Sequence, residues 1–260
     1  MEQNEFRSVS AAKDYLEEKF EIEAAFDISE HGVVEDTLSV TEVGDKVIVA
    51  CLKYDQDPMD YFSNDDGAGE LFQFRNVDER DSKAKELKKD KKLFYLVDKY
   101  DHSAVHFSVS QTANYPDQRW DVSHGCAIYV PCDYIQDEYK KMAKKEGVET
   151  AKAHFVKDSN SVLDEYSNWC NGEVYGYSVT IFNKKGEELN CDECWGFIGQ
   201  KYAEEEKKSV EKHYVDKEFE EVQEKKVKAT LSKNKNSAQM DLFENNDNVV
   251  ANPKPKKPKP

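Results

Sequence analysis

Two short polar stretches contain the residue types that metal-assisted hydrolysis needs. Asp101 and His102 lie in a predicted turn between two strands, and Asp121 and His124 come just before another predicted strand. Two carboxylates and two imidazoles suit an intermediate metal such as zinc, manganese or iron, which activates water for hydrolysis. Asp101, His102 and Asp121 are therefore the candidate catalytic residues of a metal-dependent hydrolase or nuclease. Their spacing matches no metal-binding motif, and the alternative is an Asp-His turn that only caps its hairpin.

The cysteines offer a second metal-site hypothesis. Cys191 and Cys194 form a Cys-x-x-Cys pair, while Cys126 and Cys132 are more widely spaced. A structural zinc needs four such ligands on two tight turns. Reduced, buried thiols are the favoured interpretation, so no cofactor is predicted and zinc is kept as an alternative. Cys126 follows His124 by two residues, which leaves a thiol nucleophile as a further alternative.

A short apolar peptide, Gln-Met-Asp-Leu-Phe, lies at residues 239–243 in a polar segment near the end of the chain. The surrounding residues Ser232–Pro260 are rich in Lys, Asn and Pro and have too few apolar side chains to form a core. The peptide resembles the bacterial sliding-clamp-binding motif. The resemblance implies polar contacts by Gln239 and insertion of Leu242 and Phe243 into an apolar pocket, with Met240 and Asp241 completing the motif.

Five stretches in the middle of the chain resemble, in their order, an uncharacterised protein family of tailed bacteriophages and prophages. They are DQDPMDYFSNDDGAGELFQF (55–74), YDHSAVHFS (100–108), WDVSHGCAIYV (120–130), YSNWCNGEVYGYSV (166–179) and ECWGFIG (193–199). The resemblance implies a phage origin and gives no mechanism. His124, Cys126 and Cys191 depart from the family pattern, which weakens any site built on them.

Charge is unevenly distributed along the chain. The net charge is −16, and residues 1–70 hold 19 Asp and Glu against 5 Lys and Arg. An acidic body repels phosphates, so direct nucleic-acid binding is not expected, although such a body could act as a DNA mimic that inhibits a host DNA-processing or defence enzyme. Residues 249–260 carry four Lys and no acid, which suits local contact with nucleic acid or an acidic surface. The acidic loop Asp55–Gly69 is interpreted as a surface loop.

The pattern of apolar residues predicts an α+β fold with a small, mostly antiparallel sheet and flanking helices. Strands are expected at 46–54, 71–74, 92–99, 104–110, 126–130, 173–182 and 188–197, and helices at 11–25, 78–91, 134–145, 150–169 and 202–231. Four regions follow: an acidic N-terminal segment (1–45), an α+β core (46–200), a charged helix (201–231) and a disordered tail (232–260). The charged helix carries an imperfect apolar stripe that either docks on the body or self-associates.

These observations favour a phage-encoded accessory protein over an enzyme, although they leave enzymatic activity open. We expect it to act in the host cytoplasm through protein contacts, with the sliding clamp as its partner. No secretory signal and no apolar run of membrane-spanning length is present in the sequence. The metal-dependent hydrolase and the acidic DNA mimic are the alternative functions.

Overall fold

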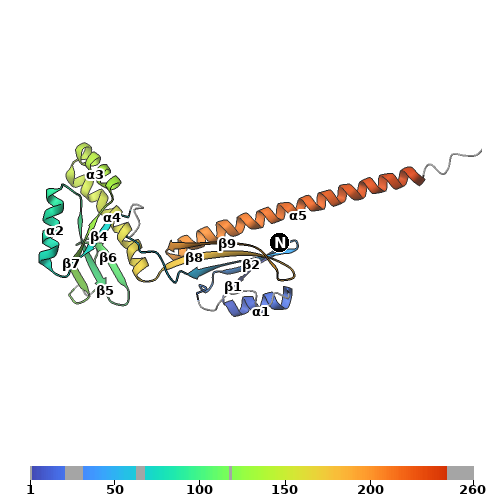
Figure 1. The fold of residues 1–260 in the computed structure, drawn as a ribbon, viewed down its shortest axis with the longest axis horizontal. Coiled ribbons are helices and arrows are strands. Elements are labelled where there is room, and N and C mark those ends of the chain that lie inside the picture. Colours follow the sequence, from blue (N-terminus) through green and yellow to red (C-terminus); the bar gives the residue numbers. More distant parts are fainter. Residues whose placement is uncertain (1, 21–31, 63–67, 117–118, 245–260) are drawn as a thin grey trace, which may run out of the picture.

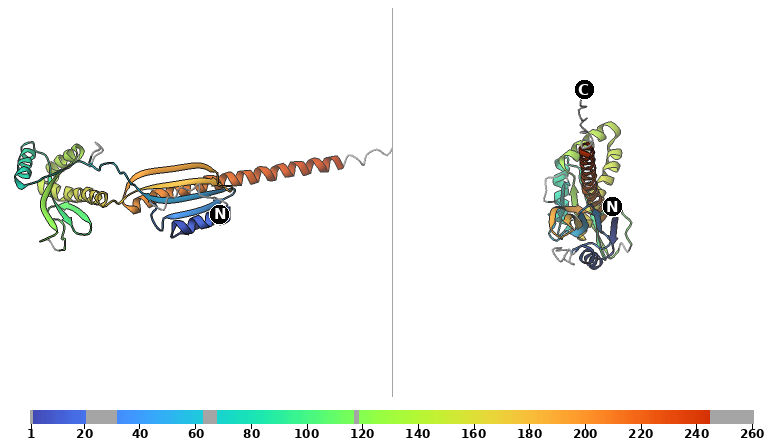
Figure 2. Two further views of the ribbon diagram at one scale, coloured as in Figure 1. Left: turned by 60° about the horizontal axis from the view of Figure 1, so that its bottom comes forward. Right: turned by 90° about the vertical axis from the view of Figure 1, so that its right-hand side faces the viewer.

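The computed structural model describes residues 2–20, 32–62, 68–116 and 119–244, and for 231–244 it describes the helical backbone. The antiparallel strands form two separate sheets, and helices pack against both sheets. The predicted α+β class is therefore confirmed. The two sheets lie end to end, and the last helix runs along the first sheet and beyond it (Figures 1 and 2). Among the described residues, no helix combines the length and the apolar character needed to cross a bilayer.

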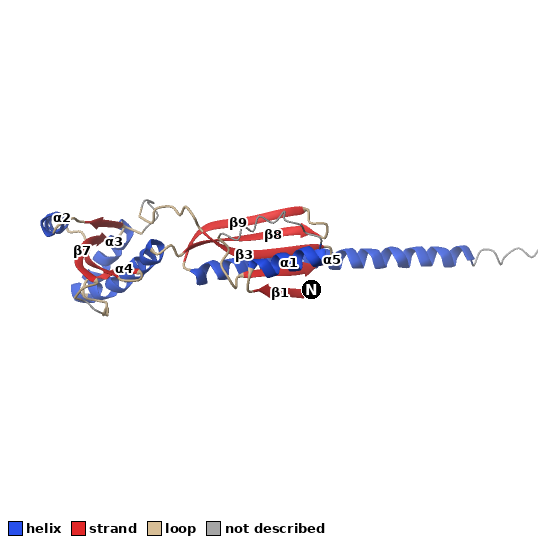
Figure 3. Ribbon diagram, turned by 90° about the horizontal axis from the view of Figure 1, so that it is seen from below, coloured by secondary structure: helices blue, strands red, loops and turns tan. Residues whose placement is uncertain are grey.

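The first sheet has five strands in the order β1-β2-β3-β8-β9. The strands are β1 (Glu2–Phe6), β2 (Leu38–Val43), β3 (Lys46–Tyr54), β8 (Val174–Asn183) and β9 (Glu188–Ile198). Its two faces are covered by α1 (Val9–Phe20) and α5 (Gln200–Glu244), and Figure 3 shows α1 in front of the strands and running roughly along them.

The middle of strand β3, residues 47–52, is apolar at every position because both of its faces are buried. Val47 and Val49 pack in the cluster that contains Leu16 of α1, whereas Ile48 and Leu52 pack in the cluster on the α5 side. Successive side chains of a strand point to opposite faces, so a strand between two helices needs apolar residues at every position. The uninterrupted apolar run VIVACL (residues 47–52) therefore marks the centre of this sheet.

The second sheet has four strands in the order β4-β7-β5-β6. The strands are β4 (Glu70–Gln73), β5 (Tyr95–Asp101), β6 (Val105–Val109) and β7 (Val122–Val130), and the helices are α2 (Val77–Lys89), α3 (Asp133–Glu146) and α4 (Val148–Cys170). Phe155, Leu163 and Tyr166 of α4 fill the larger core cluster of this sheet, and Leu87 of α2 packs in a smaller cluster with Ile128.

The second sheet is inserted between β3 and β8 of the first, which differs from the expected single core at 46–200. The N-terminal strands β1 and β2, within the segment set apart as 1–45, belong to the first sheet because β2 pairs with β3. They escaped prediction because acidic residues interrupt both strands. Only the pairing with a buried neighbour makes them strands.

Helix α5 is longer than predicted, since it continues from the expected end at residue 231 to Glu244. Residues 232–244 contain no Gly or Pro, and the first Pro after them is Pro253, so nothing in this stretch interrupts a helix. Residues 245–260 of the expected disordered tail lie outside the described residues. The sequence left open whether this helix docks on the body or self-associates. In the structure it docks on the first sheet.

The docked face of α5 matches the predicted apolar stripe only in part: Val210 and Tyr214 of that stripe pack against the first sheet. Every fourth residue from Ala203 to Val215 is buried, and this set includes Lys207 and Glu211, whereas Phe219 and Val227 are exposed. The sheet beneath α5 explains the difference. Glu211 accepts a hydrogen bond from the buried hydroxyl of Ser39 (2.8 Å), and Lys207 donates to the carbonyl oxygen of Thr37.

Candidate functional site

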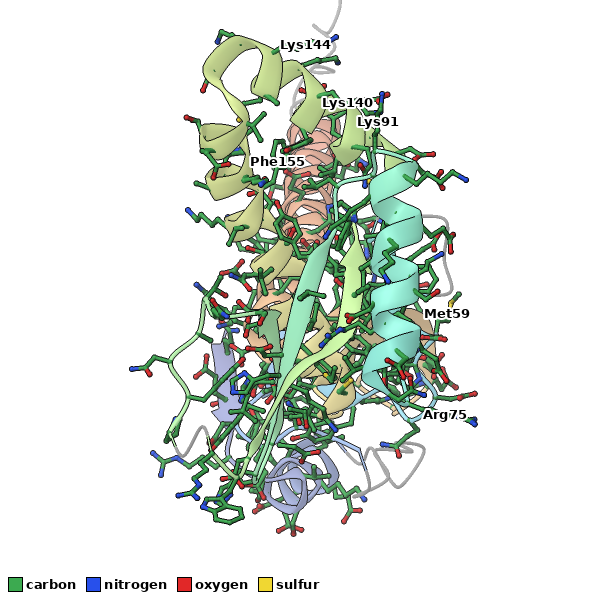
Figure 4. All side chains as sticks on the ribbon, turned by 90° about the vertical axis from the view of Figure 1, so that its left-hand side faces the viewer. Met59, Arg75, Lys91, Lys140, Lys144 and Phe155 are labelled. Atoms are coloured by element: carbon green, nitrogen blue, oxygen red, sulfur yellow. The ribbon has the colours of Figure 1, made fainter. Side chains whose placement is uncertain are left out.

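A cavity of about 470 Å³ lies where the two sheets meet, between the loop that leaves β3, the end of α4 and strand β9. We call it the junction pocket and define it by six of its lining residues: Asp55, Asp57, Met59, Tyr61, Trp169 and Trp195. Its volume is in the range of about 300–1,000 Å³ that is typical of ligand sites. Figure 4 shows Met59 at the surface of the molecule, at the rim of the structure in that view.

One wall of the junction pocket depends on a glycine in β8. A Cβ atom at Gly176 would lie only 2.3 Å from Cε3 of Trp195, so the indole ring lies directly on the glycine backbone. Beside this contact, the pairing of β8 with β9 shifts by one residue at a bulge, and Gly196 has a φ of +88° that few other residues adopt. The bulge and the glycine together place Trp195 where 44% of it stays exposed.

The opposite wall is formed by the loop after β3 and the last turn of α4. The backbone N–H of Asp57 donates to the carboxylate of Asp55 (3.1 Å), which closes a tight Asx turn. Trp169 Nε1 donates to the carbonyl oxygen of Met59 (3.0 Å) and fixes the loop to the helix. The Tyr61 hydroxyl donates to Glu165 Oε2 (3.0 Å), and burial together with this carboxylate raises the pKa of Tyr61.

Carboxylates beside the exposed Trp195 and the half-buried Trp169, which stacks on Tyr166, favour a cationic, partly aliphatic ligand. Asp55, Asp57 and Asp60 supply negative charge, while Trp169 and Trp195 supply faces for cation–π contact. Such contacts contribute about 0.5–2 kcal/mol each, depending on how far the cation is desolvated. The residues that line the pocket are carboxylates, aromatic rings and apolar side chains, a composition that suits recognition of a positively charged group.

The predicted catalytic residues lie at strand ends of the second sheet, and none of them lines the junction pocket. His102 Nδ1 contacts Asp121 Oδ2 at 3.2 Å, so the structure brings these two together. Asp101 pairs instead with Lys99 (2.7 Å), and its backbone N–H donates to the carbonyl oxygen of Asp121. His102 is largely exposed, which suits a turn that closes a hairpin better than a preorganised catalytic base.

His124 belongs to a structural cluster around the buried carboxylate of Asp98, which sequence reasoning missed. Asp98 Oδ1 accepts the backbone N–H of Gly125 (2.7 Å), and its Oδ2 contacts His124 Nδ1 (3.0 Å). Burial acts to raise the pKa of Asp98, but the hydrogen bonds from Gly125, Ser110, His124 and Gln111 outweigh it and lower the pKa. The pairing of β5 with β7 is irregular here, so the carboxylate replaces a missing backbone partner.

The four cysteines of the zinc hypothesis are not brought together. Cys126 and Cys132 belong to the second sheet and the start of α3, whereas Cys191 and Cys194 lie on β9 of the first sheet. Residues three apart on an extended strand point to opposite faces, so this Cys-x-x-Cys cannot close on one metal. Within the described residues there is no cluster of three or more metal-ligating side chains. Burial raises the pKa of Cys126, which opposes its use as a nucleophile.

The peptide at residues 239–243, which resembles the clamp-binding motif, lies at the far end of α5. Residues 223–230 of this helix are all exposed, and the helical backbone continues through residues 239–243 to Glu244. Figure 1 shows this part of α5 extending away from both sheets. The peptide is therefore held at a distance from the body of the protein.

Comparison of the chain with family models, with curated proteins and with solved structures gave no match. The resemblance to the phage family therefore stays a prediction. The sequence signal that could have revealed the junction pocket is the pair of stretches VYGY and CWGF, since they contain Gly176 and Trp195. The two stretches matter because Gly176 of β8 contacts Trp195 of β9, and the sequence alone does not show this contact.

Proposed function

We propose that this chain is a phage-encoded accessory protein that acts in the host cytoplasm and is tethered to the bacterial sliding clamp by residues 239–243. The observation that carries the proposal is the position of this peptide at the end of a helix that leaves the body. The 16 residues from 223 to 238, between the body and the peptide, span about 24 Å as a helix, which holds the peptide clear of the two-sheet body.

The composition of α5 supports its use as a spacer. Residues 223–230 include Glu224 and Lys228, which form an ion pair four residues apart (3.1 Å). Pairs of this kind stabilise an exposed helix by about 0.2–0.5 kcal/mol each. The peptide itself lies in the last turns, where helices fray at little cost, so a partner can take it up in another conformation.

Two anchor side chains supply the affinity. Burial of Leu242 and Phe243 in an apolar pocket contributes about 3–5 kcal/mol before ordering costs, which is consistent with micromolar binding. Gln239 adds polar contacts that fix the register. The negative charge of the body, which repels DNA, makes a protein partner the more suitable means of reaching replicating DNA.

Binding of the purified full chain to a bacterial sliding clamp, measured by biolayer interferometry, tests the proposal. We expect micromolar binding that is abolished in the double variant Leu242→Ala/Phe243→Ala. Val227→Ala is the matched control, because Val227 is exposed on the same helix and lies outside the peptide. Unchanged binding of the double variant, or no binding of the wild type, would refute the assignment.

The acidic-decoy hypothesis for residues 1–70 and the metal-dependent hydrolase hypothesis stay predictions. Competition with DNA for a host enzyme, lost on charge reversal of Asp55 and Asp57, would favour the decoy. Hydrolysis that requires added Mn²⁺ and is lost in His102→Ala would favour the hydrolase.

A further inference from the structure

We propose that the junction pocket binds the Lys/Pro segment Asn252–Pro260 of a second copy of this chain. The segment reads NPKPKKPKP and lies beyond the described residues, so its sequence and its place at the end of α5 carry the argument. The proposal is independent of clamp binding, which uses residues 239–243.

The chemistry of the segment complements that of the pocket. The segment combines four Pro with four Lys and contains no acid. Pro-rich sequences favour the extended polyproline II helix, and they dock in aromatic-lined grooves with a small loss of conformational entropy. In the junction pocket, the rings of Trp169 and Trp195 provide such a surface, and the carboxylates of Asp55, Asp57 and Asp60 provide partners for lysine.

The reach of the chain requires a second copy as the donor. The junction pocket includes Ile198, which is two residues from the start of α5, and the 45 residues of α5 span about 67 Å. Even the last residue of the segment is only 16 residues beyond Glu244, and 16 residues cover at most about 58 Å when fully extended. The segment therefore cannot return to the pocket of its own chain. Figures 1 and 2 show α5 ending on the side away from the second sheet.

The geometry gives self-association a defined form. If two copies exchange segments reciprocally, the assembly closes as a dimer, and if each copy donates to the next, it grows as a chain. In both cases one interaction joins unlike surfaces, a pocket and a tail. A variant that lacks the pocket can therefore still donate its tail to a variant that lacks the tail.

Sedimentation equilibrium of the full chain tests this arrangement. We expect the wild type to associate reversibly, with association weakened at least tenfold in about 1 M NaCl, where the Debye length is about 3 Å. Two variants, each on its own, should be monomeric: Trp195→Ala in the pocket, and a tail variant in which Lys254, Lys256, Lys257 and Lys259 are all changed to Gln. An equimolar mixture of the two variants should form a one-to-one complex, since one retains the tail and the other retains the pocket.

Two controls keep the test independent of folding and of clamp binding. Trp120→Ala changes a 76% exposed tryptophan outside the pocket and should associate like the wild type. Asp55→Asn/Asp57→Asn removes charge and little shape, and should replace Trp195→Ala in the mixture if that variant fails to fold. Both pocket variants should retain clamp binding.

Three results would overturn the proposal. One is a wild type that stays monomeric up to about 1 mM, which corresponds to less than about 4 kcal/mol of association free energy. The second is association of the single variants that equals that of the wild type, which would place the interface elsewhere, for example along α5. The third is a mixture of the two variants that stays monomeric.

Discussion

In the five-stranded sheet, helix α5 packs along a face, whereas in the four-stranded sheet the side chains of helix α4 also bond to the backbone of the edge strand β6. The contact of α5 with its sheet contains buried charges: Lys207, Glu211 and Glu218 are each about 5% exposed or less. Glu218 pairs with Lys46 at the start of β3. These charges lie among Ala203, Val215 and the apolar side chains of β3 and β8.

The contact of α4 with β6 uses neutral side chains and the backbone of the edge strand. The N–H groups of Val105, Phe107 and Val109 donate to Asn171, Ser167 and Asn160, each at 2.8 Å. The acceptor side chains lie on one side of α4 and at the residue that follows it. The donors are every second residue of β6, so their N–H groups point to the same side of the strand. This arrangement satisfies the open side of an edge strand that would otherwise be available to another chain.

The α5 contact and the α4 contact differ in the free energy that is needed to remove their polar groups from water. Transfer of a charge from water into the contact costs free energy, and hydrogen bonds or ion pairs with the sheet offset this cost. The buried charges therefore stabilise α5 on the sheet only while these partners are present. A neutral hydrogen bond to an edge strand has a smaller desolvation cost and a smaller gain. We therefore expect substitutions in the α5 contact to have larger effects than substitutions in the α4 contact.

The largest effect is expected for Glu211→Ala. The change removes the acceptor of Ser39 and leaves buried Lys207 without the nearby carboxylate, so unfolding free energy should fall by about 3–5 kcal/mol, as measured by urea denaturation. Glu205→Ala, at an exposed position of the same helix, is the control and should change stability by less than about 0.5 kcal/mol. A smaller loss in Lys207→Met/Glu211→Met than in Glu211→Ala would show that the uncompensated charge is the cause.

A pH-dependent effect is expected at Asp98 in the second sheet. Because its folded-state pKa is lowered, the carboxylate contributes stability above its unfolded value of 3.8 and loses it as the pH falls through the folded value. Asp98→Ala should cost about 2–4 kcal/mol at neutral pH, since the N–H groups of Gly125 and Gln111 lose their acceptor.

The comparison variant for this titration is Asp98→Asn. Its stability should vary less than that of the wild type between about pH 5 and about pH 2, because the titrating group is absent. Equal slopes of stability against pH in the two proteins would assign the acid sensitivity to other carboxylates.

The smallest effect is expected for Ser167→Ala on α4. The change leaves the N–H of Phe107 buried without its acceptor and should cost about 1–3 kcal/mol. Ser161→Ala is the control, because Ser161 is exposed and bonds only within the helix. Hydrogen exchange at Phe107 should become faster in Ser167→Ala and not in Ser161→Ala. A cost above that of Glu211→Ala would reverse the proposed order of the two contacts.

The secondary-structure elements were predicted well where one residue pattern determines them. Strand β3 matches its prediction at both ends, and the helices α2, α3 and α4 match within two residues. Strands β1 and β2 were missed because their acidic residues conceal the pattern. His102 and Asp121 were grouped by residue type alone, and the structure brings them together, whereas the buried Asp98 had no local signal, since a bulge in β5 creates its role.

The amino-acid sequence by itself determined the α+β class, the central strands, the charge distribution and the presence of a clamp-like peptide and a Lys/Pro segment near its end. These properties are local, since they depend on periodicity and composition within short windows. The tertiary structure decided that there are two sheets, that α5 docks through buried charges, and that Trp169 and Trp195 share a pocket. Each of these depends on residues more than twenty positions apart, whose contacts and desolvation exist only after the chain has folded.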